Sequence, residues 1–160
     1  RPARTVRWDE YTFKYLAHPR SLRTKGRLDL GVMSLDIEGA TVRVTGPERT
    51  LVDCLSRAEF AGGIEEALVS LEGFPLFDLP LLEQCLTAMG NPRVTAAVGA
   101  FLEQEAKRLF VPEEFLLRLE RCRPGCRAYL ERSQRGGVLL KRWNLIVPHV
   151  FLRKEDSLEV

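Results

Sequence analysis

The length, composition and charge of the chain indicate an ordinary globular domain. It has 160 residues, of which 45% are hydrophobic and 29% charged, with a formal net charge of +2. Such a chain is long enough to bury a core without disulfides or metals, and its composition excludes disordered and fibrous proteins. No apolar run reaches the roughly 20 residues of a membrane-spanning helix, and we see no signal peptide, so we expect a cytoplasmic protein.

The first 44 residues are predicted to be rich in strands. Four short strands are expected, at residues 5–8, 11–17, 28–35 and 37–44. In the second of these, Tyr11, Phe13 and Tyr15 alternate with other residues, which predicts one buried aromatic face. The polar stretch at residues 18–26 indicates a loop or a strand edge protected by cations.

At Thr45 the spacing of apolar residues changes from two to three or four, which predicts a helical part over residues 45–135. Thr45 and Glu48 have the spacing of a capping box. Gly73 is expected to end a helix in the left-handed conformation, and Gly90 to stop the next one. About five helices are expected, at residues 46–58, after Gly62-Gly63, after Asp78, after Asn91-Pro92 and after Pro112.

The last part of the chain is predicted to return to the sheet. A short helical piece at residues 127–133 precedes Gly136-Gly137, and residues 138–147 have a strand-like pattern. Residues 137–148 are therefore expected to rejoin the N-terminal strands. The predicted fold class is α+β, with a small, mostly antiparallel sheet packed against a layer of about five helices, and residues 1–160 are expected to form a single domain.

Positive charges are concentrated at the two ends of the chain, whereas its middle is acidic. If the ends lie together in the fold, they form a basic face that can meet phosphates, with counterion release supplying the affinity. The other explanation is ordinary solvated surface charge. The candidate nucleic-acid contacts are Arg4, Arg7, Arg20, Arg23, Lys25, Lys141 and Arg142.

Both tryptophans stand next to basic residues. Trp8 follows Arg7, and Trp143 follows Lys141-Arg142. Aromatic rings beside cations are typical of single-stranded nucleic-acid sites, where bases stack on the rings. Partial burial in the core is the other explanation, and the one we favour.

Residues that could carry catalysis are few. The only histidines, His18 and His149, are each next to a proline, which argues against a base for a Ser or Cys nucleophile. Cys122 and Cys126 lack the two further ligands that a zinc site needs, and no glycine pair has the sequence of a phosphate-binding loop. We therefore expect four reduced cysteines, no metal, no cofactor and no enzyme activity. A small metal-dependent nuclease is a third alternative, which would need carboxylates and a lysine in one cleft.

The segment at residues 42–55 reads V-R-V-T-G-P-E-R-T-L-V-D-C-L. It resembles the V-T-S-P-E-R-T-L-L-D-L-L signature of the AbiEi family of type IV antitoxins, where the signature joins a strand to the first helix of the C-terminal domain. Weaker similarities follow in the same order at residues 62–68, 99–103 and 142–145. The residues that match the signature are Thr45, Pro47, Glu48, Arg49, Thr50 and Asp53.

The resemblance implies a two-domain, DNA-binding transcriptional regulator of a toxin–antitoxin system that acts in abortive infection. An N-terminal winged helix-turn-helix would bind promoter repeats, and the present chain, which begins at Arg1, would be the C-terminal antitoxin domain that supports promoter binding and autoregulation. The functional partner would be a nucleotidyltransferase-like toxin, countered without a stable complex. The alternative function is a protein-interaction or dimerisation module of a transcriptional regulator.

The signature also has a structural explanation. Thr45 and Glu48 can cap a helix, Pro47 can rigidify its first turn, and Arg49 and Asp53 are neighbours at i and i+4. We favour this structural role over direct contact with a ligand.

Overall fold

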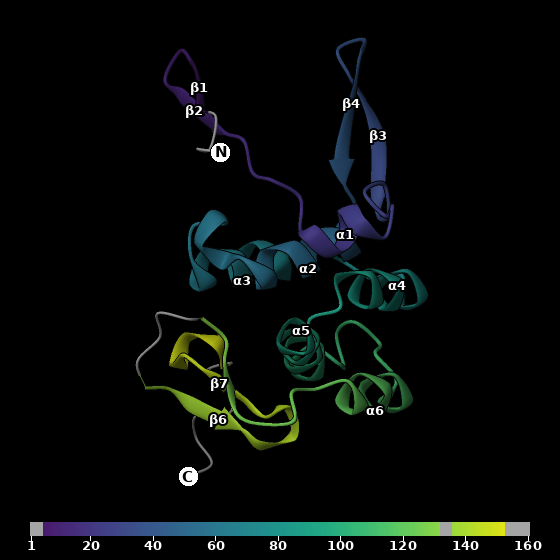
Figure 1. Ribbon diagram of the computed structural model, residues 1–160, viewed down its shortest axis with the longest axis vertical. Helices are drawn as coiled ribbons and strands as arrows, with labels where there is room; N and C mark the ends of the chain where they lie inside the picture. The colour runs from purple at the N-terminus through teal and green to yellow at the C-terminus, as the bar shows by residue number, and fades with distance from the viewer. Residues whose placement is uncertain (1–4, 132–135, 153–160) are drawn as a thin grey trace.

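The computed structural model describes residues 5–131 and 136–152 and has the predicted α+β class (Figure 1). Its helices lie in layers, with α5 between α2 and α6. No helix in this part of the chain has the length and apolar character needed to cross a membrane. The helices are α1 (Arg20–Thr24), α2 (Pro47–Ser56), α3 (Ile64–Glu72), α4 (Leu79–Met89), α5 (Pro92–Gln104) and α6 (Glu113–Arg121), and the short 3-10 helices are η1 (Ala58–Phe60), η2 (Lys141–Trp143) and η3 (His149–Phe151).

The hydrophobic core is centred on α5. Every residue of this helix from Val94 to Leu102 is buried. Several of them are alanine or glycine, whose small size lets neighbouring elements approach the helix closely. Leu51 and Val52 of α2 and Phe115 of α6 belong to the same buried cluster. The five main helices therefore share one core, as the apolar spacing predicts.

Helices α4 and α5 begin after Asp78 and Asn91, as the sequence predicts. The Asp78 carboxylate accepts a hydrogen bond from the backbone N–H of Leu81 at 2.9 Å, and the Asn91 side chain accepts one from Arg93 at 3.1 Å. Gly90 stands between the two helices with φ +61°, in the left-handed region that glycine adopts without strain. These signals are local, so they can be read from the sequence.

Two other local predictions were wrong. Gly73 ends α3 with φ −70° and ψ −15°, a right-handed conformation, and the following Phe74 N–H donates to the Leu71 carbonyl at 3.2 Å. Residues 18–26 contain α1 in place of a loop or strand edge. The helix forms there because Leu22 is buried in the core, which holds the segment against the protein.

Within the described residues the strands form three separate sheets, not one. The two N-terminal sheets are antiparallel hairpins. In the third sheet β7 lies in the middle, parallel to β5 and antiparallel to β6. The strands are β1 (Thr5–Trp8) with β2 (Tyr11–Lys14), β3 (Val32–Ile37) with β4 (Ala40–Thr45), and β5 (Ala128–Tyr129), β6 (Val138–Leu140) and β7 (Leu145–Val147).

The prediction that residues 137–148 rejoin the N-terminal strands is therefore wrong. The run is interrupted by η2 and by Asn144, which has φ +50°, so that β7 turns back to pair with β6. The expected helical piece at residues 127–133 contains β5, because the Ala128 N–H donates to the Asn144 carbonyl at 2.9 Å. Residues 132–133 lie outside the described residues.

The two N-terminal hairpins project from the helical layers (Figure 1). The aromatic face predicted to be buried is exposed: Tyr11, Phe13 and Tyr15 are each about 60% accessible to solvent. The strand predicted at residues 11–17 keeps its alternation only as far as Lys14, where β2 ends, and no second layer of the described residues covers it. Alternation shows that a strand has two unlike faces, and it does not show what covers either of them.

Candidate functional site

The signature segment lies where β4 leads into α2. Gly46 is the N-cap of α2 and Pro47 its first residue. The predicted capping box of Thr45 and Glu48 is absent, because Thr45 precedes the cap by one residue and its hydroxyl is 2.8 Å from that of Thr50 instead. The strand-to-helix context matches the resemblance, whereas the proposed capping does not.

Glu48 connects the starts of two helices. Its side chain is buried, and Oε1 accepts a hydrogen bond of 2.7 Å from the backbone N–H of Asp78. Asp78 in turn caps α4. A buried carboxylate is stabilised by hydrogen bonds to backbone N–H groups. Glu48 thus fixes the start of α2 against the start of α4, a contact that no sequence pattern predicts.

Arg49 and Asp53 form the i, i+4 pair that the sequence predicts. Arg49 is only 3% exposed, and its Nε donates to Asp53 Oδ2 at 2.8 Å. A second guanidinium nitrogen donates to the Leu30 carbonyl at 3.1 Å. The adjacent Gly31 has φ +68°, and a Cβ there would come within 2.8 Å of the Arg49 Cβ. Arg49 therefore holds the loop before β3 on α2.

A second junction brings together two of the weakly similar segments. The indole ring of Trp143 is fully buried against Gly99 of α5, where an added Cβ would lie 2.2 Å from a ring carbon. Trp143 Nε1 donates to Glu103 Oε2 at 2.7 Å. Residues 99–103 and 142–145 thus meet in space although they are about 40 positions apart in the sequence.

Arg142 joins this junction to α6. Its guanidinium donates to Glu103 at 2.7 Å, to Glu113 at 2.6 Å and to Glu120 at 3.0 Å. Burial lowers the pKa of the Arg142 side chain, but its hydrogen bonds to the carboxylates of Glu113, Glu103 and Glu120 outweigh burial and raise the pKa. Arg142 was a candidate nucleic-acid contact. Because three carboxylates already bind its guanidinium, its role is structural.

The other candidate nucleic-acid contacts do not form one surface. Arg7, Arg20 and Arg23 lie in β1 and α1, whereas Lys141 begins η2, between β6 and β7. Figure 1 shows β6 and β7 on the opposite side of the helical layers from β1 and α1. All four are exposed, and none of them forms an ion pair among the described residues. The condition that both basic ends lie together is therefore not met.

Lys25 is exposed, but its ammonium group has backbone partners. Its Nζ donates to the carbonyls of Thr87 and Ala88 at 3.0 and 3.2 Å, near the end of α4. A cation at the C-terminus of a helix is stabilised by the helix dipole. Arg4, the remaining candidate, lies outside the described residues.

The tryptophans have opposite environments. Trp143 is buried, as we favoured, whereas Trp8 is 75% exposed. The sequence patterns predicted neither this exposure nor the uncovered apolar face of the β3–β4 hairpin. One pattern could have predicted the exposure. The short N-terminal strands alternate strictly, and the helical part that follows them has enough apolar residues to form a core without them.

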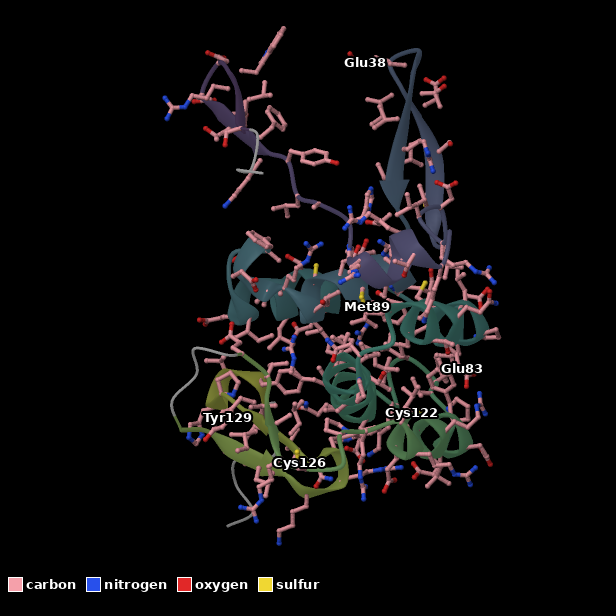
Figure 2. The ribbon with its side chains drawn as sticks, in the orientation of Figure 1. Glu38, Glu83, Met89, Cys122, Cys126 and Tyr129 are labelled. Atoms are coloured by element: carbon pink, nitrogen blue, oxygen red, sulfur yellow. The ribbon has the colours of Figure 1, made fainter. Side chains whose placement is uncertain are left out.

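The acidic side chains, histidines and cysteines of the described residues do not cluster as metal ligands do. Among them, no group of three or more His, Cys, Asp or Glu side chains could hold a metal ion. Cys122 lies at the end of α6 and Cys126 beside the sheet of β5, β6 and β7, both as exposed free thiols (Figure 2). Burial raises the pKa of Cys54 and, most strongly, that of Cys85 to about 11.

The cysteines are expected to react in two classes. At pH 8, about one Cys85 side chain in a thousand is a thiolate, the form that reacts with iodoacetamide. A labelling time course followed by mass spectrometry should therefore show rapid modification of Cys122 and Cys126 and slow modification of Cys54 and Cys85. In Cys122→Ser/Cys126→Ser the rapid phase should vanish. Equal rates at all four cysteines would contradict the burial of Cys85.

Comparisons of the chain with protein-family models, with curated proteins and with solved structures find no significant match.

Proposed function

We propose that this chain is the C-terminal antitoxin domain of an AbiEi-type type IV regulator, a domain without enzyme activity. The observation that carries the proposal is the signature at residues 45–53, which stands at a strand-to-helix junction as it does in that family. The contact between residues 99–103 and 142–145 supports it, because two separately weak similarities belong to one packed junction.

In this proposal the domain supports promoter binding by contacts to phosphate. Arg7, Arg20 and Arg23 are exposed in β1 and α1 and form no ion pair with another described residue, so their charges are available to a polyanion. Such contacts release counterions, and each one adds about 0.9 to the slope of log affinity against log salt concentration. The contribution is independent of sequence, so specificity would come from the N-terminal domain that the resemblance implies.

The promoter role predicts a salt-dependent affinity that depends on these arginines. We expect the chain to bind duplex DNA from its own promoter, and Arg7→Gln/Arg20→Gln/Arg23→Gln to lower the salt slope by roughly 2 to 3. Fluorescence anisotropy at several salt concentrations measures both. Lys141→Gln, on the other side of the protein, is the matched control and should leave the slope unchanged. Binding that does not respond to salt or to the triple substitution would refute the DNA role.

The antitoxin role has a separate test. Co-expression of the chain with a nucleotidyltransferase-like toxin from the neighbouring reading frame should restore growth that the toxin alone arrests. Gly125→Ala is the control variant and should restore growth as the unsubstituted chain does, because an added Cβ at this position meets no described atom within 4 Å. Growth arrest that persists with abundant folded chain would refute the antitoxin function, whatever the DNA measurement gives.

A second candidate function, a protein-interaction module, is favoured by the two uncovered hairpin faces. Exposed apolar faces of this kind are typical of protein interfaces. Light scattering that gives a mass above one 18.2 kDa chain, or specific binding of the purified toxin, would support this function. A strict monomer that does not bind the toxin would exclude it.

A further inference from the structure

The β1–β2 and β3–β4 hairpins each carry one apolar face that nothing in the described chain covers. We infer that these faces are a self-association surface, on which β1–β2 of one copy packs against β3–β4 of a second copy and the reverse contact forms at the same time. This inference rests on the interaction function proposed above and names the second copy as its partner. An isolated two-stranded hairpin is marginally stable in water, so both hairpins gain from being covered.

The register of the first hairpin separates its apolar and polar residues. Val6 pairs with Phe13 and Trp8 with Tyr11, so the four share one face, and each is more than half exposed. The opposite face carries Lys14, whose Nζ lies 5.1 Å from the centre of the Phe60 ring in η1. The polar face is therefore the one that meets the protein, and the aromatic face is turned away from it.

The second hairpin has the same division. Its pairs Met33–Val44, Leu35–Val42 and Ile37–Ala40 place six apolar residues on one face, while Ser34–Arg43 and Asp36–Thr41 lie on the other. Four of the six are between 39% and 52% exposed, namely Met33, Leu35, Ile37 and Val42. Glu38, at the turn between the strands, stands at the far tip from the helices (Figure 2).

The two faces together have the area of a stable interface. An aromatic side chain has about 150 to 250 Å² of surface, so Trp8, Tyr11 and Phe13 expose on the order of 400 Å². The aliphatic side chains of both hairpins raise this to roughly 800 Å², which is what one partner contributes to a standard interface. A two-fold dimer with both contacts would cover nearly all of it.

Charge disfavours contact between two copies of the β3–β4 hairpin. The β1–β2 hairpin, residues 5–14, carries two cations and two carboxylates and is neutral, whereas the β3–β4 hairpin, residues 32–45, carries one cation and two carboxylates, a net charge of −1. Opposite charges attract across an interface, and like charges oppose it. Two β3–β4 hairpins would therefore repel each other, whereas the neutral first hairpin of one copy can meet the second hairpin of the other without repulsion. Stacking of single-stranded nucleic acid on the aromatic face would leave the aliphatic, acidic hairpin uncovered.

The test uses one pair of substitutions on each face. We expect the 160-residue chain to dimerise at micromolar concentrations, and Trp8→Thr/Phe13→Thr and Leu35→Thr/Ile37→Thr each to raise the dimer Kd at least tenfold. Sedimentation equilibrium measures the Kd. Threonine keeps strand propensity, and Val69→Ala, at an exposed position on α3, is the control that should not change it.

Mixing the two double variants tests the reciprocal arrangement. In a mixed dimer one contact combines both altered faces and the other combines both native faces, so the mixture should associate more tightly than either variant alone. A monomeric chain, a Kd that neither variant raises, or a mixture no tighter than its components would overturn the inference. A dimer insensitive to the variants would leave the interaction function intact and refute only this surface. A monomer that binds oligo-dT through Trp8 would show that the aromatic face is a nucleic-acid site and not a self-association surface.

Discussion

Gly99→Ala is expected to destabilise the fold by about 1 to 3 kcal/mol, although alanine is the better helix former by about 1 kcal/mol. The added Cβ would lie 2.2, 2.3 and 2.8 Å from three ring carbons of Trp143. The ring is fully buried and tethered to Glu103, so it cannot move aside without breaking that hydrogen bond or its packing. Urea unfolding followed by circular dichroism measures the change in the free energy of unfolding.

Two controls identify the overlap as the cause. Gly125→Ala adds the same methyl group where no described atom lies within 4 Å, and should change stability by less than about 0.5 kcal/mol. In a Trp143→Leu background the overlap with Gly99→Ala is relieved, so the cost of the alanine should fall by at least half. An equal cost in both backgrounds would show that the Trp143 ring does not restrict this position.

Local signals in the sequence predicted local structure, but they did not predict the contacts between segments that are distant in the sequence. Asp78, Gly90 and Asn91 act within a few residues of themselves, and the helix ends they predict are present. Strand pairing is set by which segments meet in space. The chain from residue 138 could rejoin the N-terminal strands or form a sheet of its own, and its alternation is the same in both cases.

In the candidate site, too, the local contact was predicted and the distant ones were not. The Arg49–Asp53 pair lies within one helix turn and was predicted, whereas the Glu48 contact to Asp78 spans 30 positions and was not. Trp8 and Trp143 both follow an arginine, yet one is exposed and the other is buried. Nothing in their neighbouring residues distinguishes them, because the difference lies in whether a helix is available to cover the ring.

The structural role of the signature predicts that Arg49→Met costs about 3 kcal/mol. Removing one partner of a buried ion pair typically costs about 3 to 5 kcal/mol, because it leaves the other charge without compensation. The Asp53 side chain is 25% exposed and can recover some hydration, which places the cost at the lower end. Its Oδ1 already lacks a hydrogen-bond partner among the described residues. Thermal and urea unfolding measure the loss.

The double variant Arg49→Met/Asp53→Leu should be more stable than Arg49→Met, since an apolar pair leaves no buried charge. Arg118→Met is the matched control: it breaks an exposed pair with Glu83 and should cost less than about 1 kcal/mol. If Arg49→Met costs no more than this control, the signature residue does not hold the fold, and direct contact with a ligand becomes its better explanation. If the cost is as expected, antitoxin activity should fall only in proportion to the folded fraction, whereas the Arg7, Arg20 and Arg23 substitutions should weaken DNA binding without changing stability.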